Sequence, residues 1–182
     1  LDRSSAASDV YKRQIEARYL FGLAPERIEV VIHPQSVIHS MVEYTDRSVV
    51  AQLGTPDMRV PIAYGLSWPE RIESGAAALD FAALGALTFE PPDSRRFPGL
   101  QLAWEALAGP TGTTAVLNAA NEEAVAAFLD RRLGFDQIHQ VNHATLSGCH
   151  PSKPSSLDDL LAIDAMARAA ARESVSYTHL RA

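Results

Sequence analysis

The chain has 182 residues, of which 22 are acidic and 16 are Lys or Arg, so its formal net charge at pH 7 is -6. Apolar residues make up 47% and charged residues 21%, ordinary values that exclude a disordered or collagen-like protein. No apolar run approaches the roughly 20 residues of a membrane helix, and the acidic balance argues against a nucleic-acid partner.

Cys149 is the only cysteine, so an internal disulfide is excluded and a reducing compartment such as the bacterial cytoplasm is favoured. The chain begins at Leu1, without an initiator methionine or an apolar signal region. We therefore expect it to begin inside a longer gene product.

The first half of the chain reads as mixed helix and strand. Ile15, Tyr19 and Leu20 recur at helical spacing, and Pro25 bounds that helix. Runs rich in β-branched residues predict strands at 28–32, 37–44 and 49–53. Residues 45–48 join the last two strands as a hairpin turn, so this part of the chain is expected to form a three-stranded piece of sheet.

A helix is predicted to start between Asp57 and Arg59 and to end before Pro69, because proline disfavours helical geometry at the residue before it. Residues 69–99 are rich in proline and glycine and read as a long connection, with a strand at 86–90.

The second half is rich in alanine, the best helix former, and predicts a helical bundle. The expected helices span residues 98–107, 114–133, 136–146 and 156–173. Ser156 should cap the last of them through the amide of Asp159, and Gly134 should stop the second.

Two terminal stretches, residues 1–14 and 175–182, show no amphipathic period that continues into their neighbours. Both resemble peptides translated from sequencing-adapter DNA, and we interpret them as non-native tails. The alternative is a pair of natural loose termini.

Four runs of residues carry a family resemblance, and the first two are long and specific. They are HPQSVIHSMV from His33, QLGTPDMR from Gln52, LNAANE from Leu117 and DDLLAID from Asp158. In this order they closely resemble the 1-deoxy-D-xylulose 5-phosphate reductoisomerases of the non-mevalonate isoprenoid pathway. The match covers about residues 15–173.

The resemblance implies an α+β fold in which the end of a mixed-sheet catalytic domain precedes a C-terminal helical bundle. Residues 15–72 match the catalytic domain, residues 73–98 a connection and residues 99–174 the helical domain. The family's N-terminal Rossmann domain should be absent, because the chain has no G-x-G-x-x-G turn.

The resemblance further implies a homodimeric oxidoreductase and isomerase. Such an enzyme rearranges 1-deoxy-D-xylulose 5-phosphate, a small phosphosugar, and reduces the product to 2-C-methyl-D-erythritol 4-phosphate. NADPH supplies the hydride, and Mn²⁺ or Mg²⁺ stabilises developing negative charge on the substrate oxygens. We expect this truncated chain to be inactive alone and to bind neither cofactor tightly.

The expected metal site is missing from the chain. A family glutamate that binds the metal falls on Arg13, and a cation there would repel a metal ion. We read this as truncation at the junction with the tail, and we assign no metal ligand.

Four residues are candidates for the active site by resemblance. Ser36 and His39 match positions that border the substrate and support the catalytic centre. Pro56 and Met58 match positions that line the nicotinamide pocket. The alternatives are that His39 satisfies a buried hydrogen bond on a strand and that Met58 belongs to the core.

Two further polar sets invite functional interpretations. Asn118, Asn121 and Glu122 share one helix face, and hydrogen bonding between helices is the favoured role. His139 and His143 have a spacing that zinc can use, but a firm third ligand is missing, so a solvated helix face is favoured.

Arg47 stands in the hairpin turn where the family usually has glycine. A positive φ would cost arginine roughly 1 kcal/mol, so we expect the turn to change type.

A second function is also open: a non-catalytic helical interaction module derived from the enzyme. A genuine start codon just before Ile15 would favour the module, whereas upstream codons for a Rossmann domain would favour the enzyme.

Overall fold

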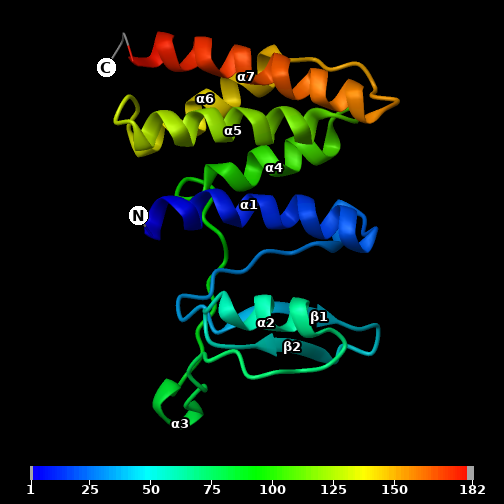
Figure 1. Ribbon diagram of the computed structural model, residues 1–182, viewed down its shortest axis with the longest axis vertical. Coiled ribbons are helices and arrows are strands. Elements are labelled where there is room, and N and C mark those ends of the chain that lie inside the picture. The colour runs from blue at the N-terminus through cyan, green and yellow to red at the C-terminus, as the bar shows by residue number, and fades with distance from the viewer. Residues whose placement is uncertain (1, 180–182) are drawn as a thin grey trace. The chain divides into compact units, whose positions relative to one another are not determined.

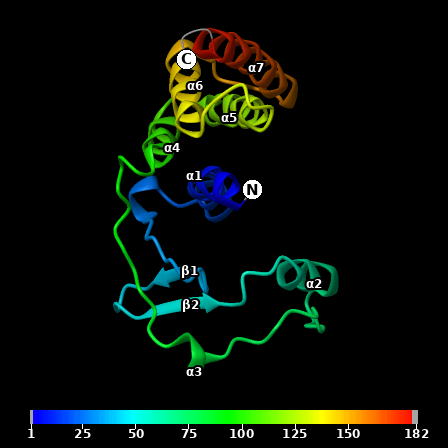
Figure 2. The same ribbon diagram turned by 90° about the vertical axis from the view of Figure 1, so that its left-hand side faces the viewer.

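The structure is a computed structural model that describes residues 2–179, with side chains described for residues 12–177. The chain divides into two compact units, one formed by residues 1–29 and 93–182, the other by residues 30–92. Figures 1 and 2 show the helices and strands of both units.

The first unit is a bundle of five helices among the described residues. They are α1 (Asp2–Phe21), α4 (Pro98–Ala108), α5 (Thr113–Leu129), α6 (Phe135–Gly148) and α7 (Leu157–His179), with a short 3-10 turn at Pro25–Arg27. Helix α5 packs against both α6 and α7, and α4 lies between α1 and α5 (Figure 1). Within the described residues, no helix is both long and apolar enough to cross a membrane.

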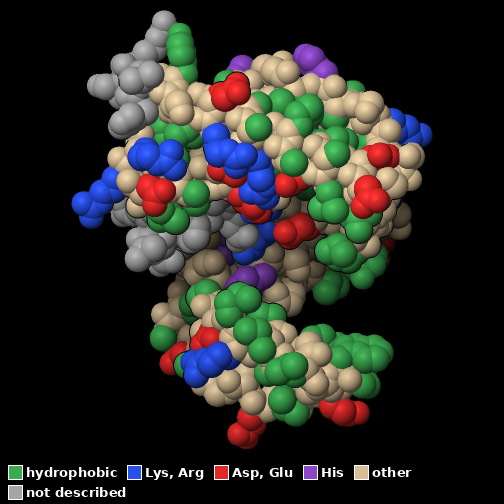
Figure 3. Space-filling model, turned by 45° about the horizontal axis from the view of Figure 1, so that its top comes forward, with side chains coloured by type: hydrophobic (Ala, Val, Ile, Leu, Met, Phe, Trp, Pro, Cys, Tyr) green, Lys and Arg blue, Asp and Glu red, His purple; other side chains and the backbone are tan. Residues whose placement is uncertain are grey.

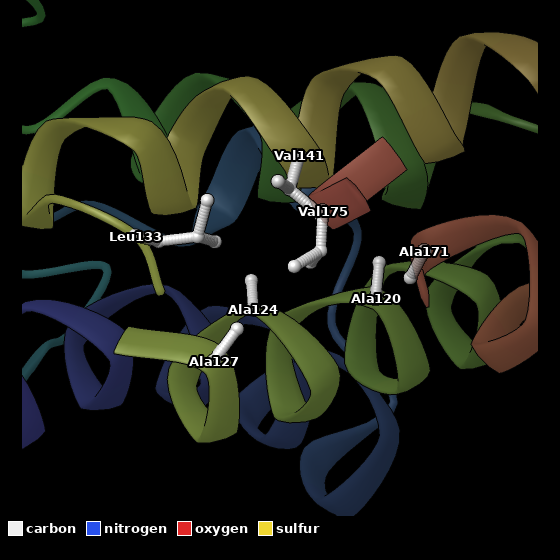
Figure 4. Close-up of a cluster of buried hydrophobic side chains, with 7 residues drawn as sticks. All are labelled: Ala120, Ala124, Ala127, Leu133, Val141, Ala171 and Val175. Carbon is white, nitrogen blue, oxygen red and sulfur yellow. The ribbon is translucent and has the colours of Figure 1, made fainter. Parts of the chain in front are cut away.

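Small side chains let these helices approach closely. Ala120, Ala124 and Ala127 recur along one face of α5 and are fully buried. They meet Val141 of α6 and Val175 of α7 in the cluster drawn in Figure 4. The alanines therefore do two things: they favour helix formation, and their side chains form much of the core of the bundle.

The start of α7 is capped as the sequence predicts. The Asp159 amide donates to the Ser156 hydroxyl at 3.1 Å, and the Asp159 carboxylate accepts from the Ser156 amide at 3.1 Å. This reciprocal pair satisfies two amide donors that the first turn would otherwise leave unpaired.

Gly112 brings the start of α5 against α7. Its φ is +101°, and a Cβ placed on it would lie 3.1 Å from Cδ1 of Ile163. A side chain there would be both strained and crowded, so glycine permits this close approach.

The second unit consists of a hairpin and two helices among the described residues. Strand β1 (Ile38–Glu43) pairs antiparallel with β2 (Val49–Leu53), followed by α2 (Arg59–Ser67) and α3 (Phe81–Leu84). Val37, at 3% exposed, is the one fully buried apolar side chain described in this unit.

The α+β class, the hairpin, α2 and the bundle helices are confirmed. The strand predicted at 28–32 is wrong, because only Ile32 pairs, in an isolated bridge with Glu90. The strand predicted at 86–90 is wrong for the same reason, so the described sheet has two strands, not three.

The helix boundaries also differ in two places. Helix α5 ends at Leu129 because Arg131 adopts a left-handed φ of 59°, and Gly134 caps α6 instead of stopping α5. Helix α7 continues beyond residue 173, since Val175 is 2% exposed in the core.

The expectation for Arg47 is wrong, because its φ is +70°. The Tyr44 carbonyl accepts from the Arg47 amide, and the Tyr44 amide donates to Ser48, as in a three-residue hairpin loop with one left-handed position. An ion pair of 2.6 Å from Arg47 to Glu43 partly offsets the strain.

The expected tails remain predictions. Helix α1 runs through most of residues 1–14, and α7 extends to His179. Residue 1 and residues 180–182, which belong to these tails, lie outside the described residues.

Candidate functional site

Ser36 closes a tight turn just before the hairpin. Its amide donates to the His33 carbonyl at 3.0 Å, and its φ is +51°. A left-handed conformation is uncommon for a residue other than glycine and costs roughly 1–2 kcal/mol. The turn leaves Ser36 exposed, so its hydroxyl is open to a ligand.

His39 occupies an irregular position in β1. Ile38 pairs with Leu53 and Ser40 with Gln52, so the register gains one residue on β1 at His39. Such a bulge twists a strand and redirects a side chain, and bulges are frequent beside active sites. His39 is exposed, which disagrees with the alternative that it satisfies a buried hydrogen bond.

The ends of the hairpin bring the candidates together. The Val37 carbonyl accepts from the Gly54 amide at 3.0 Å, which joins the Ser36 side of the hairpin to the loop before Pro56. A Cβ placed on Gly54 would lie 4.0 Å from Cε1 of His39. Ser36, His39 and Pro56 therefore flank one end of the hairpin.

Met58 lies at the start of α2 and is 71% exposed, so the alternative that it belongs to the core is wrong. Next to it, Asp57 accepts three hydrogen bonds from the Arg59 guanidinium, the shortest at 2.6 Å. The bonds from Arg59 lower the pKa of the Asp57 carboxyl. This pair holds the loop that presents Pro56 and Met58.

The turn before Ser36 is also held from a distant segment, which the sequence analysis missed. His33 Nδ1 lies 2.8 Å from the Thr88 carbonyl, and the His33 ring stacks on Phe89 at 4.9 Å. Gln35 and Thr88 exchange hydrogen bonds through their side chains. No local pattern links residues 53 positions apart, so the sequence carries no signal for this pairing.

The polar set on α5 has the structural role that was favoured. Asn142 of α6 donates to buried Asn121 at 3.1 Å, and Arg168 of α7 donates to Glu122 at 2.6 Å. Asn118 donates to Glu122 within α5. These bonds join three helices. In Figure 3, acidic and basic side chains lie side by side on the surface of the bundle.

The described residues give no support to the interpretation of His139 and His143 as zinc ligands. The rings of His139 and His143 are 6.2 Å apart, and burial, followed by the His143 charge, lowers the pKa of His139. Cys149 is buried, which raises the pKa of its thiol. Within the described part of the chain, no three His, Cys, Asp or Glu side chains are grouped to hold a metal.

The bundle unit has a hollow of about 740 Å³ between α1 and the starts of α5 and α7. Its lining includes Tyr19, Asn118 and Leu160 but none of the four candidate residues. The hollow and the candidate site are thus separate features of different units.

A family model for the DXP reductoisomerase C-terminal domain matches residues 53–170. The chain belongs to the DXP reductoisomerase family. This match begins at the end of β2, so it includes α2, the connection and most of the bundle.

Similar whole proteins support the same assignment. The 1-deoxy-D-xylulose 5-phosphate reductoisomerase of Chlorobium phaeobacteroides is 56% identical over 158 residues, which are 87% of this chain and 41% of the relative. That of Cellvibrio japonicus is 57% identical over 87% of this chain and 40% of the relative. The chain therefore spans about two fifths of the length of its curated relatives.

Solved reductoisomerases share the fold. The Zymomonas mobilis enzyme in complex with NADPH is 48% identical, with a TM-score of 0.85 over 94% of this chain and 45% of that chain. A reductoisomerase crystallised with fosmidomycin and magnesium is 39% identical, with a TM-score of 0.84 over 97% of this chain and 47% of that chain.

Proposed function

We propose that this chain is the rear part of an enzyme that converts 1-deoxy-D-xylulose 5-phosphate to 2-C-methyl-D-erythritol 4-phosphate. The observation that carries the proposal is the DXP reductoisomerase match over residues 53–170. The exposed candidate residues at one end of the hairpin support it, because a substrate site must be open to its ligand.

In this proposal, residues 15–72 complete the catalytic domain and residues 99–174 form the helical domain. The intact enzyme is a homodimer in the bacterial cytoplasm. A single buried cysteine, Cys149, suits a reducing compartment.

Ser36 and His39 act on the phosphosugar substrate. The Ser36 hydroxyl can donate to one substrate oxygen and accept from another. His39 lies at the bulge in β1 and is exposed, so its ring is free to support the same site. Neither Ser36 nor His39 has to carry a buried charge to play this role.

Pro56 and Met58 form one wall for the nicotinamide of NADPH. The cofactor supplies a hydride to the rearranged substrate when it is bound. A flat ring packs well against an exposed thioether and a proline ring, so the two residues fit this part of the cofactor. The rest of the cofactor site belongs to the portion of the enzyme that this chain does not span.

The described residues of this chain do not fit the divalent metal, whether Mg²⁺ or Mn²⁺. Arg13 replaces the expected glutamate and is exposed, and the described residues group no metal ligands. We derive no catalytic step through a metal held by this chain, and we expect the chain to be inactive alone.

A chimera tests the proposal. The upstream part of the Aeromonas hydrophila relative, which is 56% identical over 88% of this chain, is joined before Ile15. The chimera should oxidise NADPH when 1-deoxy-D-xylulose 5-phosphate and Mg²⁺ are added, and the 182-residue chain should not. A folded chimera that binds NADPH without turnover would favour the non-catalytic helical module instead.

A further inference from the structure

The segment around Thr88 clamps the turn that precedes Ser36. Ile32 and Glu90 exchange two backbone hydrogen bonds of 2.9 Å. Beyond this bridge, the His33 side chain contacts both the Thr88 carbonyl and the Phe89 ring. All these residues belong to the unit of residues 30–92.

The side chain of Gln35 completes the clamp. Its Nε2 donates to the Thr88 hydroxyl at 2.9 Å, and its Oε1 accepts from the Thr88 amide at 3.3 Å and from the Thr88 hydroxyl at 3.2 Å. The single residue Thr88 therefore binds the turn at both His33 and Gln35.

Ser36 lies between this clamp and the hairpin. On its other side, Val37 is buried, and its carbonyl accepts from Gly54. A strained φ persists only where the surrounding contacts hold it. Since the hairpin holds one side of Ser36 and Thr88 the other, the position of the serine depends on both.

We propose that Thr88 and Phe89 are positioning residues for the substrate site, acting on Ser36 and, through the adjoining strand, on His39. The proposal rests on the proposed function, because that function gives the two residues their role. In this role, neither Thr88 nor Phe89 touches the substrate. Residues of the segment 73–98, which was expected to be only a connection, thus also set the geometry of the site.

The first test needs only the 182-residue chain. Thr88→Val removes the hydroxyl at nearly constant volume, and hydrogen exchange of the Ser36 amide should accelerate by about fivefold, the equivalent of one neutral hydrogen bond. Thr88→Ser should restore slow exchange. Thr45→Val, the same change in the hairpin turn, is the matched control and should leave Ser36 unaffected. Unchanged exchange in Thr88→Val would overturn the proposal.

The second test measures kinetics in the chimera. Thr88→Val and Phe89→Leu should each lower kcat/KM for the phosphosugar by roughly tenfold, as small displacements in catalytic sites do, with Thr88→Ser close to the parent. The KM for NADPH should stay within about twofold, because Pro56 and Met58 lie outside the clamp.

His39→Gln separates the two proposals. If His39→Gln abolishes turnover while Thr88→Val and Phe89→Leu keep the parent kcat/KM, the positioning proposal is overturned and the proposed function stands. If His39→Gln is fully active, the assignment of this site in the proposed function is wrong. The exchange test then still decides whether Thr88 holds Ser36.

Discussion

Arg168 of α7 donates a hydrogen bond to Glu122 of α5 across 2.6 Å, although 46 positions separate them in the chain. The same guanidinium binds Asp164 one turn earlier at 2.7 Å and lies 3.7 Å from Glu123. The hydrogen bonds that Arg168 donates to Asp164 and Glu122 raise the pKa of Arg168, which therefore stays charged. One cation thus joins α5 to α7.

Replacing this cation should weaken the bundle. Arg168→Met leaves three carboxylates without their shared partner, and the side chain is only 29% exposed. We expect the free energy of unfolding in urea to fall by about 1 kcal/mol, the upper end for surface ion pairs. Arg95→Met is the control, because Arg95 is 91% exposed and lies 3.8 Å from Asp93. Equal losses in both variants would contradict this role.

The pH dependence of stability should report the same contact. The hydrogen bond from Arg168 is the main cause that lowers the pKa of Glu122 from its ordinary 4.5. Because the folded pKa is the lower one, its stabilising contribution is present above about pH 4.5 and is lost as the pH falls through the folded value.

Glu122→Gln should therefore flatten the fall in unfolding free energy on acidification below pH 4.5. Urea titrations at several pH values measure the effect, with Glu173→Gln on the exposed face of α7 as control. An unchanged acid profile in Glu122→Gln would show that the contact is not formed in solution.

Gln14 is expected to destabilise the protein as it stands. Its side chain is 2% exposed, and neither its Nε2 nor its Oε1 has a hydrogen-bond partner. Burying an unpaired amide costs about 1–3 kcal/mol. Gln14→Leu should raise the free energy of unfolding by about 1 kcal/mol or more, whereas Gln101→Leu, on exposed α4 surface, should stay within about 0.5 kcal/mol. A loss of stability in Gln14→Leu would refute the unpaired burial.

Arg47 carries backbone strain that glycine would relieve. Its φ of +70° favours Arg47→Gly by about 1 kcal/mol. The lost ion pair to Glu43 subtracts a few tenths of a kcal/mol, since Arg47 is 86% exposed. Thermal unfolding should therefore shift upward. A lower midpoint would mean that the Glu43 contact outweighs the strain.

Hydrogen exchange should separate the two units. The bundle buries clusters around Ala124 and Val116, while the unit of residues 30–92 buries only Val37 among its described apolar side chains. Val42, Val50 and other large apolar side chains of the hairpin stay exposed. Amides of α5 should exchange more slowly than those of β1 and β2. Equal protection in a monomer would contradict this order.

The helical bundle shows how much of the structure local sequence patterns can predict. Apolar spacing and alanine content predicted α4 to α7, and the Ser156 cap formed with its predicted partner. The end of α5 was misplaced by four residues, because the left-handed turn at Arg131 has no glycine to mark it. The sequence motifs likewise identified the candidate residues Ser36, His39, Pro56 and Met58, all of which lie in the unit of residues 30–92.

By itself, the sequence determined the family, the hairpin, most helices and the identity of the candidate residues, since these depend on short-range spacing and on motifs. Only the tertiary structure decided that residues 28–32 form a single bridge, that Gln14 is buried unpaired, and that Thr88 clamps the turn at Gln35. The reason is physical. Burial and hydrogen bonding between distant segments depend on how the chain returns on itself, and no period in the sequence encodes that return.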